Sequence, residues 1–409
     1  QPIEHILAAA KEHQADAVGM SGLLVKSTVI MRENLIEMTR EGLSLPVILG
    51  GAALTRGYVE ADCVKAYGAG KVAYARDAFD GLELMDKVMT GRFDEHLSER
   101  AKLQEGKPER RKDRRLEALE RPVEKARPVE LEEIRLRRAE LGKGLAVPTP
   151  PFFGPRMIDK VPIRNLLPFL NEAMLFQFHW GFKKAGKSRE EFAEWAKREV
   201  RPIMVKLAKQ CADENIIVPK AAYGYWKAAG EGNDLVLFDE NGTAEVARFT
   251  LPRQNREDGL CIADFVRDIS DPERDVIGLQ DVTAGARASE VAAEWFKENR
   301  YQDYLYLHGF SVEIAEAMAE YVHKRIRNEL GFGNEDERDI NKLLKQGYRG
   351  SRYSFGYPAC PNLGDQRRLL ELLGAERVGV VMGEEDQLEP EQSTSAIVIL
   401  HPQAKYFTV

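Results

Sequence analysis

The first ninety residues alternate between amphipathic stretches and short apolar runs. Apolar residues spaced three or four positions apart predict helices over residues 3–11, through Met31 and Met38, and over 58–67 and 78–89. Short apolar runs between them predict buried strands over residues 17–20, 46–49 and 71–74. This alternation is typical of a parallel α/β sheet with helices on its faces. Because a doubly wound sheet normally opens with a strand and this chain opens with a helix, we expect the first domain to be incomplete at its N-terminus.

A charged stretch follows this first domain. Residues 99–140 interleave Arg, Lys and Glu with few large apolar side chains, so they cannot bury much core. They predict a solvated helix and connector, closed by the stiff spacer Pro148-Thr-Pro-Pro151. An RNA-binding arm is the alternative, but its charges are mixed and it has no aromatic residues.

The pattern after residue 152 predicts an α+β domain. Apolar and alternating runs predict strands over residues 221–226, 234–238, 245–251, 261–266, 276–283 and 395–400. Asn241-Gly242 is a hairpin signal between the second and third of these strands. Helical periodicity predicts helices over residues 189–215, 286–299, 311–330 and 366–373. We therefore expect an antiparallel sheet covered by helices.

Composition narrows the class of protein. A chain of 409 residues is too long for one ordinary core, which favours two domains. The net charge of -7 argues against nucleic-acid binding, and no apolar run approaches the roughly 20 residues of a membrane span. The four cysteines have no CxxC spacing, so neither a disulfide framework nor a zinc site is indicated. We expect a cytoplasmic protein that binds neither nucleic acid nor membrane.

Two loops follow predicted strand ends in the first domain, at Ser21–Ser27 and Gly50–Ala52. Open parallel sheets bind ligands at the carboxyl ends of their strands. Small residues there allow a large flat ligand to approach the backbone, and Ser21 and Ser27 offer hydroxyls. The alternative is structural, because glycines are common wherever strands end.

The stretch Arg352-Tyr-Ser-Phe-Gly-Tyr-Pro-Ala-Cys-Pro361 combines a cation, two tyrosines, a glycine and two prolines. Pro358 and Pro361 each fix φ, and Gly356 permits backbone angles closed to other residues. We predict a stiff loop, neither helix nor central strand, that presents Arg352 to a ligand. The alternative is a rigid surface turn without a binding role.

Asp264 is the one acid in the apolar run 261–266. A buried carboxylate needs a partner, which is either a structural lysine or arginine or a ligand amine. In the second case Arg352 would bind a carboxylate in bidentate geometry, and the pair would recognise the zwitterionic end of an amino acid. Tyr357 and Tyr406 would then be candidates to stack on an aromatic part of the ligand.

Several motifs resemble the cobalamin-dependent methionine synthase family. Met20-Ser-Gly-Leu-Leu-Val-Lys-Ser27 with Gly50-Gly-Ala-Ala53 is similar to its cobalamin-binding domain. Four further motifs resemble its C-terminal reactivation domain: Ile262-Ala-Asp-Phe-Val266, Ala319-Glu-Tyr-Val-His323, Arg352–Pro361 and His401-Pro-Gln-Ala-Lys-Tyr406. The motifs follow one consistent order along nearly the whole chain.

The resemblance implies an α/β flavodoxin-like (Rossmann-like) cobalamin domain over residues 1–97, incomplete at its N-terminus. A charged linker over residues 98–145 would connect it to a C-shaped α+β activation domain with a bent antiparallel sheet, over residues 146–409. The first domain would hold the lower face and nucleotide tail of cobalamin. The residues implied for the tail pocket are Ser21, Leu23, Ser27, Gly50, Gly51, Tyr74 and Ala75.

The activation domain is expected to bind S-adenosylmethionine. By resemblance, Asp264 would bind the methionyl amine and Arg352 the methionyl carboxylate. The remaining contacts implied for this ligand involve Tyr353, Ser354, Gly356, Tyr357 and Tyr406. Glu320 and His323 match positions where the family's helix faces the cobalamin domain. No residue is expected to act as acid or base, because the domain's task is to position a methyl group.

The sequence also departs from the family. The family's cobalt ligand lies in an Asp-x-His-x-x-Gly motif that this chain lacks, so no metal ligand is expected here. Tyr353-Ser-Phe355 stands where the family commonly has Pro-Ala-Pro. Sites for homocysteine, folate and zinc belong to upstream modules of the family and are not expected in this chain.

The function implied is that of the C-terminal part of a methyltransferase. It would bind cobalamin, which carries the methyl group as methylcobalamin, and reactivate oxidised cobalamin with a methyl group from S-adenosylmethionine. Its partners would be the upstream homocysteine, folate and cobalamin-cap modules and a flavodoxin-like electron donor. One alternative is a corrinoid carrier or cobalamin-sensing module without S-adenosylmethionine chemistry, and another is an interaction protein that binds neither ligand.

Overall fold

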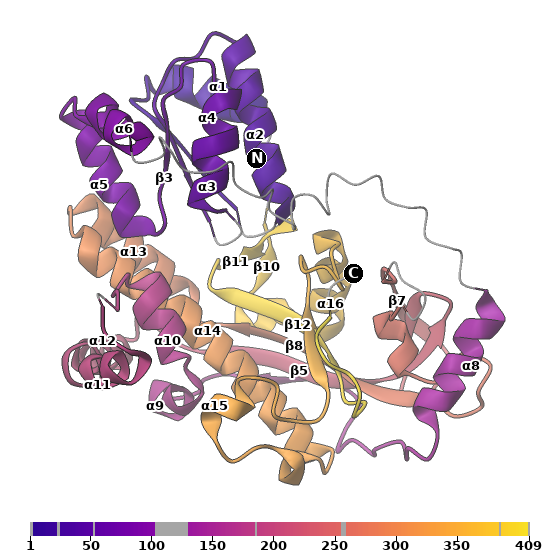
Figure 1. The fold of residues 1–409 in the computed structure, drawn as a ribbon. Helices are drawn as coiled ribbons and strands as arrows, with labels where there is room; N and C mark the ends of the chain where they lie inside the picture. Colours follow the sequence, from indigo (N-terminus) through magenta and orange to yellow (C-terminus); the bar gives the residue numbers. More distant parts are fainter. Residues whose placement is uncertain are drawn as a thin grey trace. The chain divides into compact units, whose positions relative to one another are not determined.

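The computed structural model describes residues 3–22, 25–51, 54–102, 130–184, 186–254, 259–383 and 386–407. The chain divides into two units, residues 1–125 and 126–409, which are described separately (Figure 1). None of the helices within these described ranges has the length and apolar character needed to cross a membrane.

The first unit is built on a parallel sheet in the order β1 (Val18–Ser21), β2 (Val47–Gly50) and β3 (Val72–Tyr74). Alternate residues of β2 point to opposite faces, so Val47 and Leu49 pack in one core and Ile48 in another. The predicted parallel α/β arrangement is therefore confirmed. The helical segments of the unit are α1 (Ile3–Glu12), α2 (Val25–Arg40), α3 (Arg56–Tyr58), the π-helix η1 (Val59–Cys63), α4 (Val64–Ala66), α5 (Ala78–Met89) and α6 (Phe93–Lys102).

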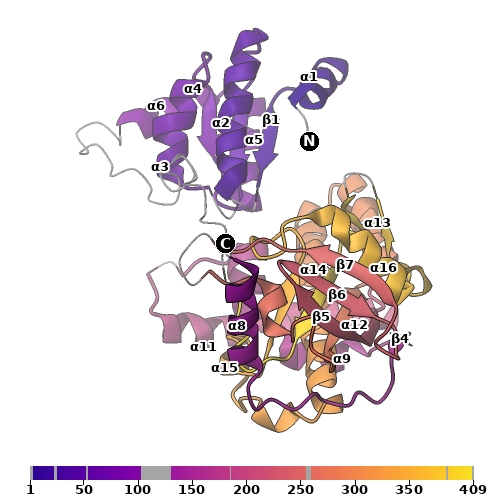
Figure 2. The ribbon, with the colours of Figure 1, turned by 90° about the vertical axis from the view of Figure 1, so that its right-hand side faces the viewer.

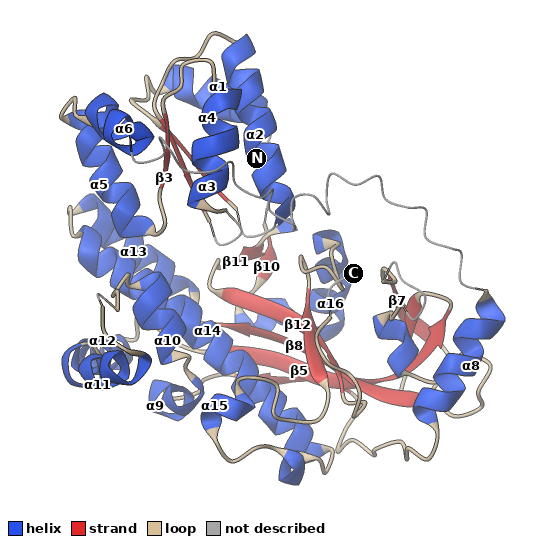
Figure 3. Ribbon diagram, in the orientation of Figure 1, coloured by secondary structure: helices blue, strands red, loops and turns tan. Residues whose placement is uncertain are grey.

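The second unit contains an antiparallel sheet of seven strands (Figure 3). The order is β7 (Glu245–Thr250), β6 (Asp234–Phe238), β5 (Lys220–Glu231), β8 (Asp275–Thr283), β12 (Ser393–Ile399) and β9 (Ser351–Ser354), with β4 (Gly154–Ile158) also paired to β5. The long strand β5 pairs with β4 through its first half and with β6 through its second half. It therefore joins the two parts of the sheet. A separate small ribbon pairs β10 (Val381–Met382) with β11 (Leu388–Glu389).

Helices cover both faces of this sheet. The long helix α14 (Tyr301–Glu329) packs on one face through Phe310, Ile314 and Met318, and α16 (Gln366–Leu373) packs on the other through Leu369 and Leu373. The other helical segments are α8 (Leu131–Gly142), α9 (Ile163–Leu166), η2 (Leu167–Phe169), α10 (Glu172–Met174), η3 (Leu175–His179), α11 (Arg189–Glu199), α12 (Arg201–Asp213), η4 (Ile262–Phe265), α13 (Ala286–Lys297), η5 (Gly333–Glu335), α15 (Ile340–Leu343), η6 (Leu363–Asp365) and η7 (Ala375–Val378).

Four sequence predictions differ from the structure. The helix predicted over 189–215 is two helices, because Pro202 in the first turn of α12 lacks the backbone N–H that a continuous helix needs. The strand predicted over 261–266 is the short 3₁₀ helix η4. The stretch from Arg352 begins in the edge strand β9, and α14 begins at Tyr301.

The charged linker also contains structure. Helix α8 lies within the range expected to be linker, yet it belongs to the second unit. It buries Ile134 and Arg138, and Arg138 donates to carbonyls of η4, of β5 and of the turn between β5 and β6. Figure 2 shows the ribbon of α8 within the second unit. The mixed charges of this segment are thus partly internal ion-pairing groups of the second unit.

Candidate functional site

Arg352 lies on the edge strand β9, which pairs with β12 in the register Arg352 to Val398. Successive side chains of a strand point to opposite faces. Tyr353 therefore points into the core, where it is 1% exposed and donates its hydroxyl hydrogen to the Lys405 carbonyl at 3.0 Å. The Arg352 and Ser354 side chains are half-buried on the opposite face. Of the residues expected to contact S-adenosylmethionine, Tyr353 can thus offer a ligand its backbone only.

The Arg352 guanidinium points toward α14. Its Nη2 lies 3.4 Å from Oε2 of Glu320, and 19% of its side chain is exposed. Burial alone would lower the pKa of Arg352, but Glu320, Glu316 and Tyr348 outweigh it and raise the pKa. Glu316 is exposed, yet the surrounding protein desolvates its carboxylate and raises its pKa, an effect that Arg352 opposes. A permanent cation and an accessible carboxylate thus occupy one region.

Two tyrosines adjoin this region. Tyr357 and Tyr406 are 50% and 39% exposed, and their rings lie edge to face with centroids 6.3 Å apart. Burial raises the pKa of the Tyr357 phenol, with Glu316 adding to the shift and Arg352 opposing it. Tyr357 thus lies against Tyr406 and within electrostatic range of Arg352 and Glu316, and the assignment of these side chains to one binding site stays a prediction.

A tight turn places Tyr357 after the strand. Gly356 has a φ of 84° and donates its N–H to the Cys360 carbonyl at 2.9 Å, while the Cys360 N–H bonds back to the Tyr357 carbonyl. A side chain at Gly356 would meet both this left-handed conformation and Leu363 Cδ2 at 3.0 Å. The predicted stiff loop is therefore an edge strand followed by a glycine-dependent turn.

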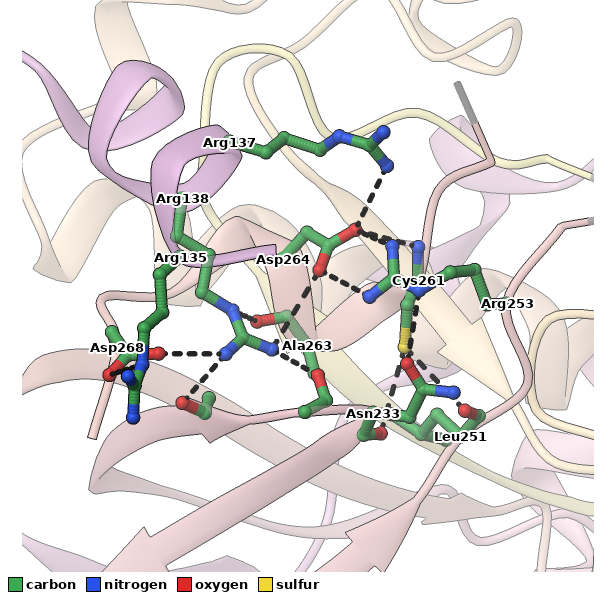
Figure 4. A network of polar contacts seen from close by, with 12 residues as sticks. Arg135, Arg137, Arg138, Asn233, Leu251, Arg253, Cys261, Ala263, Asp264 and Asp268 are labelled. Carbon is green, nitrogen blue, oxygen red and sulfur yellow. Dashed lines mark hydrogen bonds and ion pairs between the residues drawn. The ribbon is translucent and has the colours of Figure 1, made fainter. Parts of the chain in front are cut away.

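Asp264 lies elsewhere, in a network of arginines (Figure 4). Its carboxylate is fully buried and accepts two hydrogen bonds from Arg253, at 2.5 and 2.7 Å, and one from the Cys261 N–H at 3.1 Å. Arg138 and Arg137 of α8 approach it to 3.7 and 4.0 Å. Asp264 was expected to bind a ligand amine, but in this structure it forms an ion pair with Arg253 instead. Both of its oxygens are occupied, and solvent has no access to them.

Glu320 and His323 were expected on a helix surface that faces the cobalamin domain, and the structure places them differently. Both are buried within the second unit, with exposures of 3% and 0%. His323 packs edge-on against Tyr348 at 4.8 Å, and in the described part of the chain neither of its ring nitrogens has a hydrogen-bond partner. Desolvation, with Arg327, Arg352 and Lys405 nearby, lowers its pKa well below the usual value, so the ring is neutral.

The residues predicted to hold cobalamin lie at the strand ends of the first unit. Ser21, Gly50 and Tyr74 are the last residues of parallel strands, so they share one edge of the sheet. Gly51 has a φ of 115°, and a Cβ there would lie 2.1 Å from the Gly22 carbonyl oxygen. The two loops therefore meet backbone to backbone, which only glycine allows.

The remaining residues predicted to hold cobalamin differ in their surroundings. Ala75 follows β3 and is buried, and Ser27 lies in the first turn of α2 rather than in a loop. The Tyr74 hydroxyl donates to the Leu54 carbonyl at 3.2 Å, and Arg56 stacks over its ring at 5.0 Å. Leu23 lies outside the described residues.

Sequence reasoning missed Glu316, Arg327 and Asp336. Glu316 and Glu320 are four residues apart and hence on one face of a helix, a spacing that the motif Ala319–His323 did not cover. No local pattern indicates that Asp336 meets Arg327 after the chain turns. Among the residues that the structure describes, no cluster of His, Cys, Asp or Glu has a metal-binding arrangement, and all four cysteines are buried thiols.

Comparison with known proteins places these observations in a family. Residues 162–409 match the family model described as vitamin B12 dependent methionine synthase, activation domain. The whole chain is 43% identical over 433 residues to methionine synthase of Mycobacterium tuberculosis (strain ATCC 25618 / H37Rv) and 42% identical over 436 residues to that of Mycobacterium leprae (strain TN). It spans 36% of the length of each of these relatives.

A solved structure supports the fold of the second unit. A crystal structure described as the MetH reactivation domain bound to AdoHcy superimposes with a TM-score of 0.61 and 24% identity, covering 69% of this chain and 89% of that one. At this identity the likeness concerns the fold. With the family model matching most of its length, the chain belongs to the vitamin B12-dependent methionine synthase family and carries its activation domain.

Proposed function

We propose that this chain is the C-terminal part of a cobalamin-dependent methionine synthase and that its second unit binds S-adenosylmethionine to reactivate the cofactor. The observation that carries the proposal is the grouping of Arg352, Glu316, Tyr357 and Tyr406 in the matched activation domain. These side chains offer a cation, an anion and aromatic rings, which complement the carboxylate, the positively charged groups and the adenine of S-adenosylmethionine.

Arg352 is the proposed carboxylate clamp. A planar guanidinium binds a carboxylate through two parallel hydrogen bonds, and Glu320 meets only Nη2 of Arg352. The exposed Glu316 carboxylate is suited to the amine or sulfonium charge of the ligand. Tyr357 and Tyr406 supply aromatic surface. Asp264, held by Arg253, has a structural role in this scheme.

The chemistry needs positioning rather than proton transfer. A sulfonium methyl group is already activated, so the residues contribute by holding the donor in an aligned geometry. Cobalamin, when bound, supplies the cobalt that accepts the methyl group, and one electron comes from a reduced partner, which we propose to be flavodoxin-like. His323 is neutral and buried and takes no part in proton transfer.

The first unit is proposed to be the C-terminal portion of a flavodoxin-like cobalamin domain. Three parallel strands with helices on both faces fit one half of such a sheet. The glycine-lined edge formed by Ser21, Gly50 and Gly51 fits the approach of a flat nucleotide to the backbone. We further propose that the upstream modules of the same enzyme are partners of this chain and that the protein is cytoplasmic.

Calorimetric titration of the full chain with S-adenosylhomocysteine tests the second unit. Arg352→Ala should weaken binding about ten- to hundredfold, because a charge-assisted hydrogen bond contributes roughly 1.5–3 kcal/mol. Arg287→Ala removes an exposed arginine of α13 that pairs with Glu290, and serves as the matched control.

A change of less than twofold in Arg352→Ala would remove this residue from the site. A corrinoid carrier or cobalamin sensor would bind no S-adenosyl ligand, so absence of binding by the unmodified chain would favour that alternative.

A further inference from the structure

Four side chains of alternating charge form a continuous row in the second unit. Asp336 accepts from Arg327 at 2.7 and 2.9 Å, through Nε and Nη2. Arg327 Nη2 lies 3.3 Å from Oε1 of Glu320, and Oε2 of Glu320 lies 3.4 Å from Nη2 of Arg352. The row runs from the segment after η5, across α14, to the edge strand β9.

The inner members of this row are fixed. The side chains of Arg327, Glu320 and Asp336 are 0%, 4% and 5% exposed. Arg327 is held in bidentate fashion by Asp336 and stacks over the Tyr348 ring at 4.2 Å. Buried charges are strongly destabilising when a partner is lost, so these groups hold one another in a single geometry.

Arg352 differs from the inner members because it lies at the open end. It is 19% exposed, against 0% for Arg327, and its strand is hydrogen-bonded through β12. A flexible arginine on a four-residue edge strand has many rotamers, and selecting one has an entropic cost. Glu320 contacts the guanidinium at Nη2, and the side chain of Tyr348 is a second hydrogen-bond partner of Arg352.

We infer that Glu320, held by Arg327 and Asp336, is a positioning residue that orients the Arg352 guanidinium for a ligand carboxylate. The inference rests on the proposed S-adenosyl site and deepens it. Glu320 acts through Arg352 alone, so its effect concerns the amino-acid end of the ligand and not the nucleoside end. This makes it separable from a general role in folding.

The test compares two ligands in the full chain by calorimetry. S-adenosylhomocysteine carries the amino-acid carboxylate and amine, and 5′-methylthioadenosine has the same thioether nucleoside without either group. Glu320→Gln should weaken S-adenosylhomocysteine about three- to tenfold, in the range of one net hydrogen bond, and change 5′-methylthioadenosine by less than about twofold. Glu313→Gln is the matched control, a buried acid of the same helix that contacts His179 at 3.2 Å.

A double-mutant cycle makes the test independent of folding effects. In an Arg352→Ala background, Glu320→Gln should change S-adenosylhomocysteine affinity by less than about twofold, because its route to the ligand is gone. Glu320→Asp keeps a negative charge in the buried row but shortens the side chain by one methylene, which draws the carboxylate away from Arg352. It should show the same selective loss of S-adenosylhomocysteine binding if Glu320→Gln folds poorly.

Equal weakening of both ligands, or full additivity with Arg352→Ala, would overturn the positioning role while leaving the S-adenosyl site intact. A chain that binds neither ligand before substitution would instead overturn the site itself and the positioning role with it.

Discussion

Arg138 offers the sharpest test of how the second unit is built. Its side chain is 1% exposed although it belongs to α8, in the stretch whose sequence predicts a solvated connector. It donates to the carbonyls of Ala263 at 3.1 Å and Gly230 at 2.8 Å, to the Gly232 carbonyl, and to Asp268 Oδ2 at 3.1 Å. Replacing it by alanine removes every one of these donors at once.

The expected loss in the free energy of unfolding follows from the groups that Arg138→Ala leaves without a partner. Three backbone carbonyls at the end of β5 and in η4 lose a charged donor in a buried position, and Asp268 loses its closest ion pair. Asp264 keeps Arg253, so its own charge stays compensated. Breaking a buried ion pair from one side costs roughly 3–5 kcal/mol, and we expect Arg138→Ala to lower the free energy of unfolding by about that amount.

Urea unfolding followed by tryptophan fluorescence measures this in the full chain. The sequence has four tryptophans, at 180, 195, 226 and 295, and all belong to the second unit, so the signal reports that unit alone. Arg135→Ala is the control on the same helix. Its side chain is 52% exposed and its ion-pair distances are 3.6 and 3.8 Å, so it should cost less than about 1 kcal/mol.

If the two alanine variants unfold within about 1 kcal/mol of each other, the buried contacts of Arg138 do not stabilise the second unit to the expected extent. Arg138→Lys refines the result, because it keeps the charge but loses the planar fork that reaches several carbonyls. It should fall between the two alanine variants.

Two further substitutions test other buried features. Asp281 on β8 is fully buried, and neither of its oxygens has a hydrogen-bond partner within the described residues, so desolvation raises its pKa well above the usual value. The folded state then holds the proton that the unfolded state loses near pH 4, so stability falls as pH rises from there. Asp281→Asn should therefore raise the melting temperature by an amount that grows between pH 4.5 and 8, and a constant difference would contradict this sign. Gly51→Ala should impose about 1–3 kcal/mol of backbone strain and weaken cobalamin binding, measured by visible absorption during titration, more than Gly91→Ala, whose φ is also positive but whose surroundings are open. Equal behaviour of the two variants, or no saturable change with the unmodified chain, would speak against the proposed tail pocket.

Local sequence patterns correctly predicted the elements that depend on neighbouring residues, such as hairpins and amphipathic helices. The hairpin signal Asn241-Gly242 and the alternation around it give β6 and β7, and the apolar spacing of 78–89 gives α5 with the predicted bounds. Apolar runs misled where a side chain's partner lies far away. The run 261–266 reads as a strand, but Asp264 accepts the Cys261 N–H and draws the segment into a 3₁₀ turn.

In the candidate site, too, local features were predictable from the sequence and contacts between distant residues were not. Glycine and proline chemistry indicated the turn at Gly356, and residue chemistry together with the family resemblance indicated Arg352, Tyr357 and Tyr406 as candidate site residues. The partners of Asp264 were not predictable from sequence, because Arg253, Arg137 and Arg138 are a few among many arginines and only the fold selects them. Burial of Glu320 and His323 likewise depends on the chain that returns over α14 at Tyr348.

The strand order of the second unit has a consequence for its folding. β12 lies between β8 and β9, and its first residue, Ser393, bonds Thr283 across a sequence separation of 110 residues. Such distant pairing is slow, because loop closure must precede any gain from the contact. Until β12 inserts, β8 has an open edge and β9 has no ladder, which is the kind of edge that recruits other chains. We therefore expect the strand that carries Arg352 to become ordered late, so that refolding at high protein concentration loses chains to aggregation before this strand forms.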